Sequence, residues 1–282
     1  MKYWQTSRRQ IILDRPLVMG ILNVTPDSFS DGGKYYSADA ALQRAEAMIA
    51  EGVDILDIGG ESTRPGSAAV SVEDEIARTV PAIAAIAARF DIPISIDTTK
   101  YSVAKAALDA GAEIINDISG LRFDPGIAGL AASPGSGLVL MHSRGEFASM
   151  HKQEPVDDIF AEVKSGLRRA VDIALSARVE KKRIALDVGL GFGKTFEQNL
   201  KLIAKLDNII TDLDEYPVLV GSSRKSFIGK LLDGAPVEQR LSGSLASVAI
   251  AVFNGASILR VHDVRETVDA VKVAVAIRKE KS

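Results

Sequence analysis

Short apolar segments recur along this chain at an interval that few folds can accommodate. Seven intervals separate the eight segments, and between residues 17 and 257 they average about 34 residues, close to the length of a βαβ unit. The segments begin at Leu17, Val53, Pro93, Glu113, Gly137, Arg183, Pro217 and Ser257. Because they are apolar throughout rather than alternating, they are typical of parallel strands that are covered on both faces.

The stretches between these segments have the period and composition of helices. Clear examples are residues 38–51, 72–90, 155–177 and 264–277. Gly52 and Gly111 stand where a helix should end before the next strand. Eight consecutive βα units predict an α/β fold, a (β/α)8 TIM barrel, with an open doubly wound sheet as the alternative. We expect one domain over residues 1–282, with residues 1–14 as an N-terminal extension or hairpin.

Composition excludes several classes of protein. The formal net charge of −3 lacks the basic balance that a nucleic-acid partner would require. There is no cysteine, which excludes disulfides, thiolate zinc sites and a cysteine nucleophile. No apolar run approaches the ~18 residues of a membrane span, and the N-terminal segment lacks a secretory signal pattern. We therefore expect a cytoplasmic enzyme or binding protein with no membrane partner.

Polar residues stand at the carboxyl end of every predicted strand. They are Asn23, Asp57, Glu61, Asp97, Asn116, Asp117, His142, Asp187, the segment 222–226, Arg260 and His262. One such residue is ordinarily a helix cap or a turn former, but eight polar strand ends in succession predict a site at this face of the barrel. Two long connections, residues 24–37 and 60–71, follow the first two strands at the same face and favour a functional role.

Cations are concentrated after the last two strands. Arg224 lies in the segment SSRKS, and Arg260 follows the eighth strand. In barrels of this kind the loops after strands seven and eight commonly bind phosphate. We expect Ser222 or Ser223 to cap the helix that SSRKS begins, so that its free N–H groups face an anion. The alternative is that the two arginines only pair with neighbouring acids.

The segment DVGLGFGKT (residues 187–195) ends like a phosphate-binding P-loop, but Val188 occupies the position of that motif's first glycine. We interpret its glycines instead as positions where the backbone approaches a flat ligand closely. The three histidines form no HExxH spacing, so a zinc ion caged by protein ligands is not expected. Mg²⁺ bound mainly by substrate phosphates is compatible with the sequence, because it needs only one or two protein oxygens.

Eight segments, in order along the chain, resemble the motifs of the dihydropteroate synthase family. They are GILNVTPDSFSDGG, DIGGESTRPG, SIDTTK, NDISG, LMHSRG, DVGLGFGKT, SSRKSFIG and RVHDV. The resemblance covers about residues 17–265. Each falls on a strand end that the apolar pattern predicts independently. The chain departs from the family's pattern at Val188, where the family usually has proline, and this departure concerns the turn after Asp187 but not the aspartate itself.

The resemblance implies a transferase of folate biosynthesis that joins 6-hydroxymethyl-7,8-dihydropterin diphosphate to p-aminobenzoate and releases pyrophosphate. It implies pterin-binding roles for Asp97, Asn116, Met141, Asp187, Phe192 and Lys225. The carboxylates can accept from the donors on the pterin's rim, and Asn116 can both donate and accept. Lys225 would donate to the acceptor side of that rim, while Met141 and Phe192 would pack against the ring faces.

For the diphosphate, the resemblance implies that Asn23 helps to hold Mg²⁺ and that Arg260 and His262 bind the phosphates. These groups would stabilise the charge that grows as pyrophosphate leaves. Asp31, in the first long connection, would shield the pterin cation when that connection closes. The catalytic residues implied in this way are Asp31, Asp97, Lys225, Arg260 and His262.

For p-aminobenzoate, the resemblance implies a site around the ring and a separate contact with the carboxylate. Phe29, Thr63, Pro65 and the stem of Lys225 would surround the ring, and Ser226 at a helix N-terminus would bind the carboxylate. Arg64 would order its loop or contact pyrophosphate. The family also implies a homodimer and inhibition by sulfonamides, which mimic p-aminobenzoate.

Two other functions are compatible with parts of this pattern. A pterin-binding methyltransferase domain would share Asp97, Asn116 and Asp187 but does not need the cations Arg260 and His262. An inactive paralogue would bind pterin or a partner only, and loss of Asn23, Arg260 or a loop motif would mark it, yet all are present. A P-loop ATPase is disfavoured by Val188.

Overall fold

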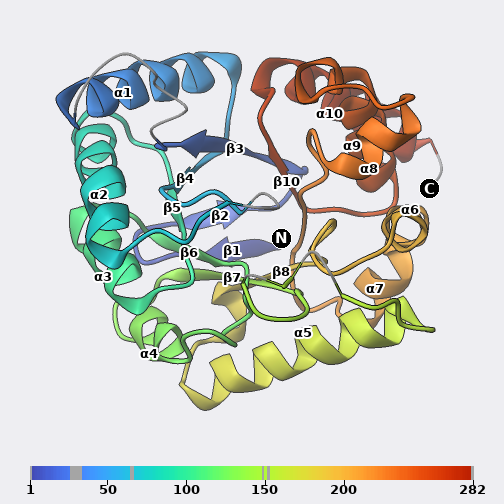
Figure 1. Ribbon diagram of the computed structural model, residues 1–282, viewed down its shortest axis with the longest axis horizontal. Helices are drawn as coiled ribbons and strands as arrows, with labels where there is room; N and C mark the ends of the chain where they lie inside the picture. Colours follow the sequence, from blue (N-terminus) through green and yellow to red (C-terminus); the bar gives the residue numbers. More distant parts are fainter. Residues whose placement is uncertain (1, 26–33, 64–66, 148, 151–152, 281–282) are drawn as a thin grey trace.

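The computed structural model of the chain describes residues 2–25, 34–63, 67–147, 149–150 and 153–280, and Figure 1 shows its architecture. Eight parallel strands form a closed barrel in the order β10-β3-β4-β5-β6-β7-β8-β9. Their bounds are β3 Leu17–Asn23, β4 Ile55–Gly59, β5 Ile94–Asp97, β6 Ile114–Asp117, β7 Gly137–Met141, β8 Ile184–Asp187, β9 Val218–Val220 and β10 Ile258–Val261. Because β10 pairs with β3, the sheet is closed, so the predicted TIM barrel is confirmed and the open sheet is wrong.

Helices lie around the outside of the barrel (Figure 1). They are α1 Lys34–Glu51, α2 Val72–Arg89, α3 Tyr101–Ala110, α4 Gly126–Ala132, α5 Ile159–Ser176, α6 Phe196–Ala204, α7 Leu206–Asp212, α8 Ser226–Leu231, α9 Leu241–Phe253 and α10 Val264–Lys279, with two 3₁₀ turns, Lys181–Arg183 and Val237–Gln239. In the part of the chain that the structure describes, no helix is both long enough and apolar enough to cross a membrane.

Local hydrogen bonds set the ends of these helices. Helix α5 begins at Ile159 rather than at residue 155, because the Asp158 carboxylate accepts from two free N–H groups of the first turn, at 2.9 and 3.0 Å. Helices α1 and α3 are followed by Gly52 and Gly111 at φ +95° and +124°. Such backbone angles favour glycine, which explains why both helices end there.

The last helix shows how the outer layer packs on the barrel. In α10, Val264 and Val271 are buried, and Val268 and Val275 are half-buried against the same core. The valines at helical spacing therefore face inward. This face of α10 serves the fold of the monomer and is not available to a second protein.

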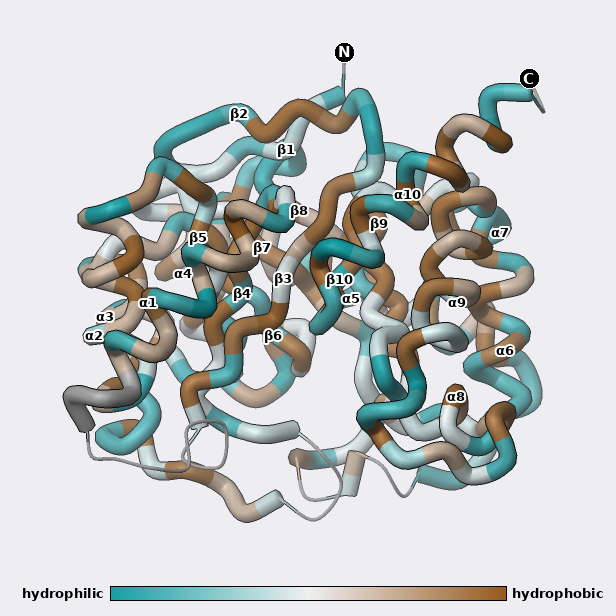
Figure 2. The backbone as a smooth tube through the Cα atoms, turned by 90° about the horizontal axis from the view of Figure 1, so that it is seen from above, coloured by the Kyte–Doolittle hydropathy of each residue, from teal (hydrophilic) through white to brown (hydrophobic). Residues whose placement is uncertain are grey.

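A hairpin covers the amino-terminal end of the barrel. Strands β1 Tyr3–Gln5 and β2 Gln10–Ile12 pair antiparallel, and Figure 2 shows them at the end of the barrel opposite α8. Trp4 is fully buried and donates through Nε1 to the Arg183 carbonyl at 2.7 Å. Thr6 donates to the buried Glu113 carboxylate at 2.5 Å. The hairpin thus covers one end of the barrel interior, and the polar strand ends lie at the opposite end.

Candidate active site

The carboxyl ends of the strands bring polar residues from distant segments into one row. In the observed register, Asn23 pairs with Gly59, Gly59 with Asp97, and Asp97 with Asn116. A Cβ at position 59 would lie 3.7 Å from Oδ1 of Asn23 and 3.8 Å from Oδ2 of Asp97. The amide of Asn23 and the carboxylate of Asp97 therefore share the space that the missing side chain leaves beside Gly59.

One guanidinium group links two carboxylates of neighbouring strands. Nε of Arg260 lies 2.6 Å from Oδ2 of Asp57, and Nη2 of Arg260 lies 2.5 Å from Oδ2 of Asp97. The Asn116 amide donates to the same oxygen of Asp57 at 3.1 Å. The other side-chain oxygens, Oδ1 of Asp57 and Oδ1 of Asn116, are buried and have no hydrogen-bond partner among the described residues. Because unpaired buried acceptors are costly, this corner fits a ligand that supplies hydrogen-bond donors.

The same corner sets the charge of Asp97. Burial raises the pKa of Asp97 to about 7, the Arg260 guanidinium opposes this shift, and the neighbouring Asp57 carboxylate adds to it. The upward direction holds despite the short ion pair, because a single cation serves two buried carboxylates and compensates neither fully. Asp97 therefore changes its charge near neutral pH.

The segment after β8 forms a second wall of the site. Asp187 ends β8 and accepts from the Gly189 N–H at 2.7 Å, and burial raises the pKa of this carboxyl. The ammonium of Lys225 donates to the Leu190 carbonyl and lies 4.6 Å from the centroid of the Phe192 ring. Burial lowers the pKa of Lys225 to about 8. This wall presents an acceptor, a donor and an aromatic face side by side.

The turn in this wall depends on a close approach between two stretches of backbone. Gly189 has φ +65°, and a Cβ there would lie 1.9 Å from the carbonyl oxygen of His142. The glycine therefore accommodates the protein's own backbone, which differs from our interpretation that it accommodates a flat ligand. Val188 is buried in the core, so the turn forms with valine in place of proline.

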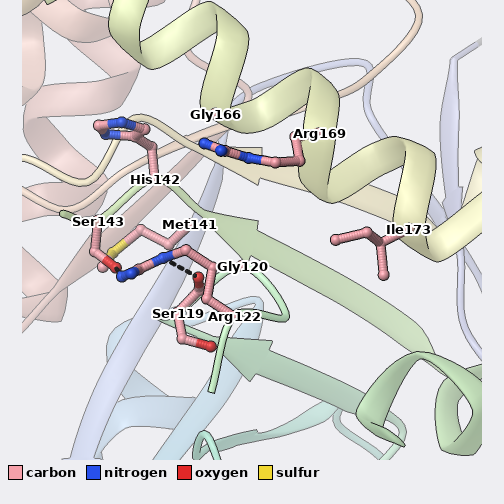
Figure 3. Close-up of a pocket in the computed structure, with 9 residues that line it drawn as sticks. All are labelled: Ser119, Gly120, Arg122, Met141, His142, Ser143, Gly166, Arg169 and Ile173. Carbon is pink, nitrogen blue, oxygen red and sulfur yellow. Dashed lines mark hydrogen bonds between the residues drawn. The ribbon is translucent and has the colours of Figure 1, made fainter. Parts of the chain in front are cut away.

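Apolar side chains pack beside this wall. Ile118, Met141, Met150 and Phe192 form one buried cluster at the end of the barrel. Between Met141 and α5 lies a cavity of about 30 Å³, which Arg122 and Arg169 help to line (Figure 3). A cavity of this size is too small for a substrate ring, so it is not the substrate site.

The segment before α8 differs from the prediction. Helix α8 begins at Ser226 with Lys225 as its N-cap and no side-chain capping bond, so the prediction that Ser222 or Ser223 caps this helix is wrong. The Ser222 hydroxyl is hydrogen-bonded to a serine hydroxyl of α9 at 2.7 Å, and the Ser223 hydroxyl to Nδ1 of His262 at 3.0 Å. Both serines lie too early in the chain to cap α8, and their hydroxyls bond to α9 and to the segment after β10 instead.

The two predicted arginines have different environments. Arg224 pairs with Asp263, with Nε 3.0 Å from Oδ2. For Arg224 the structure therefore agrees with the alternative prediction, pairing with a neighbouring acid. Arg260 also pairs with acids, but both of its partners, Asp57 and Asp97, are strand-end residues of the site. Arg260 therefore lies within the site.

Most of the predicted site residues are brought together. Those at or directly after the carboxyl ends of barrel strands are Asn23, Asp97, Asn116, Met141, Asp187, Phe192, Lys225, Arg260 and His262. Thr63 is half-buried in the connection after β4, and Ser226 is exposed at the start of α8. Four further predictions, Phe29, Asp31, Arg64 and Pro65, lie outside the described residues.

The sequence analysis gave no role to two residues, one in the site and one behind it. Asp57 was noted only as one polar strand end, although its position in DIGG directly after an apolar run was a usable signal. Lys194 was regarded only as part of a P-loop lookalike, yet its ammonium contacts the Gly189 carbonyl at 2.7 Å. No sequence pattern indicates this contact, because the partner atoms are backbone carbonyls that only the fold brings together.

Comparison with known proteins identifies the class. The family model of the pterin binding enzymes matches residues 19–262, which include seven of the barrel strands and all of β3 except its first two residues. The barrel and its polar end are therefore those of a pterin-binding enzyme.

Individual relatives identify the family to which the chain belongs within this class of enzymes. The dihydropteroate synthase of Escherichia coli is 48% identical over 264 residues, which are 94% of this chain and 92% of the relative. A Yersinia pestis dihydropteroate synthase solved with a sulfonamide drug superposes with a TM-score of 0.91 at 43% identity, covering 98% of this chain and 99% of that one. A Xanthomonas albilineans dihydropteroate synthase solved with 4-aminobenzoic acid has a TM-score of 0.91 at 44% identity, covering 98% of both chains. The chain belongs to the dihydropteroate synthase family, whose members are transferases.

Proposed function

We propose that the site joins 6-hydroxymethyl-7,8-dihydropterin diphosphate to p-aminobenzoate, forming 7,8-dihydropteroate and pyrophosphate. The observation that carries this proposal is the buried corner formed by Asp57, Asp97 and Asn116, in which two oxygens have no partner among the described residues. A pterin offers an amino group and ring N–H groups along one edge, and these donors match such acceptors. Asp187 supplies a further acceptor in the second wall.

The reacting bond belongs to the pterin's methylene group. In the proposed reaction its C–O bond to the diphosphate breaks, the pterin ring delocalises the resulting cation, and the aniline nitrogen then bonds to the methylene carbon and loses a proton. No protein nucleophile is needed. Arg260 and His262 would stabilise the charge on the departing pyrophosphate, and Asp31 remains our proposal for a group that shields the cation.

We propose Mg²⁺ as the cofactor, with Asn23 as its protein ligand. The residues fit this ion: the Asn23 Oδ1 atom is a hard oxygen donor at the strand ends beside Asp97, and Mg²⁺ usually keeps few protein ligands when phosphates complete its shell. Among the described residues no group of three or more His, Cys, Asp or Glu could hold a metal by itself. When bound, the ion would neutralise charge on the diphosphate.

For p-aminobenzoate we propose a site between the second wall and the two long connections. The stem of Lys225 passes beside Gly191, and its ammonium lies 4.6 Å from the centroid of the Phe192 ring. Thr63 stands at the start of the connection after β4. Phe29 and Pro65 would complete the ring contacts, Arg64 would order the connection, and Ser226 would bind the carboxylate. The Xanthomonas albilineans relative solved with 4-aminobenzoic acid supports a site for this substrate class.

We propose further that the protein is a homodimer located in the cytoplasm. Helices α9 and α10 pack against each other and expose Ile250, Val273 and Ile277 at 49%, 61% and 57% of their surface. We propose that these side chains belong to one apolar interface, because a contiguous apolar patch favours association. Light scattering should then give twice the monomer mass, and the double substitution I250E/V273E should give the monomer mass. A monomer in the unmodified protein at micromolar concentration would exclude the dimer.

Product formation tests the proposed function directly. Purified protein, the dihydropterin diphosphate, p-aminobenzoate and Mg²⁺ should yield dihydropteroate by chromatography, and omission of either substrate or of the metal should abolish it. Tight pterin binding without product would instead favour an inactive binder, or a methyltransferase if methyltetrahydrofolate is turned over. Neither rival explains Arg260 and His262 at the strand ends as well as a diphosphate substrate does.

A further inference from the structure

The ammonium group of Lys194 is enclosed by acceptors from two segments. Its Nζ lies 2.7 Å from the Gly189 carbonyl and 3.1 Å from the Phe192 carbonyl, both in the turn after β8. It also lies 3.0 Å from Nδ1 of His142 and 3.2 Å from the His142 carbonyl, beyond the end of β7. Burial lowers the pKa of Lys194 to about 7, but its amino group has N–H donors in either protonation state. The lysine therefore binds the turn to the neighbouring strand end.

His142 is itself fixed in one state. Burial, and next the charge of Lys194, lower the pKa of His142 to about 2, so the imidazole is neutral. Because Nδ1 faces an ammonium, the ring hydrogen resides on Nε2, which lies 3.7 Å from a Glu162 carboxylate oxygen. The ring also lies against Gly166 of α5, where a Cβ would come within 2.5 Å of its Cδ2 atom (Figure 3). His142 is therefore a rigid anchor.

The turn held by Lys194 carries groups that face the other way, into the site. The Gly189 N–H donates to Asp187, and the Leu190 carbonyl accepts from Lys225. The ring of Phe192 lies 4.6 Å from the Lys225 ammonium. Two lysines thus bind opposite sides of one turn. Lys225 belongs to the proposed substrate site, and Lys194 lies behind it.

We propose that Lys194 is a positioning residue for pterin binding: by holding the Gly189 and Phe192 carbonyls against His142, it sets the geometry of Asp187, Phe192 and Lys225. This inference rests on the proposed function and extends it to a residue behind the site. Without the ammonium, the Gly189, Phe192 and His142 carbonyls would lose the donor that they share, and the turn would relax away from β7. Small displacements of groups that orient a substrate lower binding and rate strongly.

The test uses the absence of cysteine from the chain. The first variant is K194M, which removes the ammonium. The second is K194C, which is alkylated with bromoethylamine in mild denaturant and then refolded. Alkylation returns a lysine-like ammonium at this position only. The readouts are the Kd of 6-hydroxymethylpterin by calorimetry and the kcat and KM of the synthase reaction. We expect K194M to raise the pterin Kd by about tenfold to a hundredfold, and the aminoethylated K194C variant to return it to within about threefold of the unmodified protein.

Two control variants separate positioning from loss of stability. K201M removes an exposed lysine of α6 and should leave pterin binding unchanged. T6V removes the hydrogen bond to Glu113 at the far end of the barrel, and should lower the melting temperature without changing the pterin Kd. If K194M does not fold, K194Q retains two N–H donors at the position and replaces it in the comparison.

Each result has one meaning. Three results together support the inference: K194M binds pterin more weakly, T6V binds pterin as well as the unmodified protein, and aminoethylation verified by mass restores binding in K194C. A pterin Kd in K194M equal to that of the unmodified protein, an equal loss in T6V, or failure of the aminoethyl group to restore binding overturns it. If the unmodified protein binds no pterin and forms no product, the proposed function fails instead.

Discussion

The substitution D97N isolates one charge in the pterin corner while preserving its shape. Asp97 is part of the Arg260 bridge at 2.5 Å, and its carboxylate is 11% exposed, so its interactions are only weakly screened by solvent. In the complex this carboxylate would accept from pterin donors, and a hydrogen bond to a charged group contributes about 1.5–3 kcal/mol. Since about 1.4 kcal/mol corresponds to a factor of ten in affinity, the Kd for pterin should rise about 10- to 100-fold.

Calorimetry with 6-hydroxymethylpterin at pH 7.5 measures this change without involving the diphosphate or the metal. The matched control is D109N, because Asp109 is an exposed aspartate of α3 that pairs with Lys105 four residues earlier. D109N should bind pterin like the unmodified protein. A Kd for D97N within about threefold of the unmodified protein would place Asp97 outside the pterin site and refute the reasoning from the buried corner.

Three further predictions follow from the same geometry. Because burial raises the pKa of Asp97 to about 7, the accepting carboxylate is lost as pH falls; the pterin Kd should rise about eightfold from pH 7.5 to 6, and a pH-independent Kd would contradict this. G189A should cost several kcal/mol of unfolding free energy in urea titrations, because its Cβ would lie 1.9 Å from the His142 oxygen, whereas G234A, at φ +86° with open space around it, should cost about 1–2 kcal/mol. Sulfonamides should inhibit product formation competitively with p-aminobenzoate, and no inhibition at high sulfonamide and low p-aminobenzoate would exclude a shared site.

The barrel was predictable because its determinants are local. Apolar segments mark the eight strands, and glycines such as Gly52 and Gly111 mark helix ends through backbone angles that few other residues adopt. The row formed by Asn23, Asp97 and Asn116 follows from topology, since parallel strands place their carboxyl ends at one face.

The details of the site were less predictable because side chains far apart in the sequence come into contact only in the folded chain. Ser222 and Ser223 were expected to cap a helix that in fact begins later, at Ser226. The role of Asp57 depends on Arg260, which lies 203 positions later in the chain. The partners of Lys194 are mostly backbone carbonyl groups. Because every residue has a carbonyl group, the amino-acid types in the sequence do not predict these contacts.

The bridge between Asp57, Arg260 and Asp97 has a consequence for inhibitor design. The guanidinium already pairs with one oxygen of each carboxylate. A ligand with a single donor can therefore pair with only one of the remaining acceptors and leaves another buried oxygen unpaired. Compounds with two donors on one edge would satisfy Asp97 and also the unpaired oxygen of Asp57. We therefore expect affinity within a chemical series to rise sharply with the second donor, and only modestly with added apolar area.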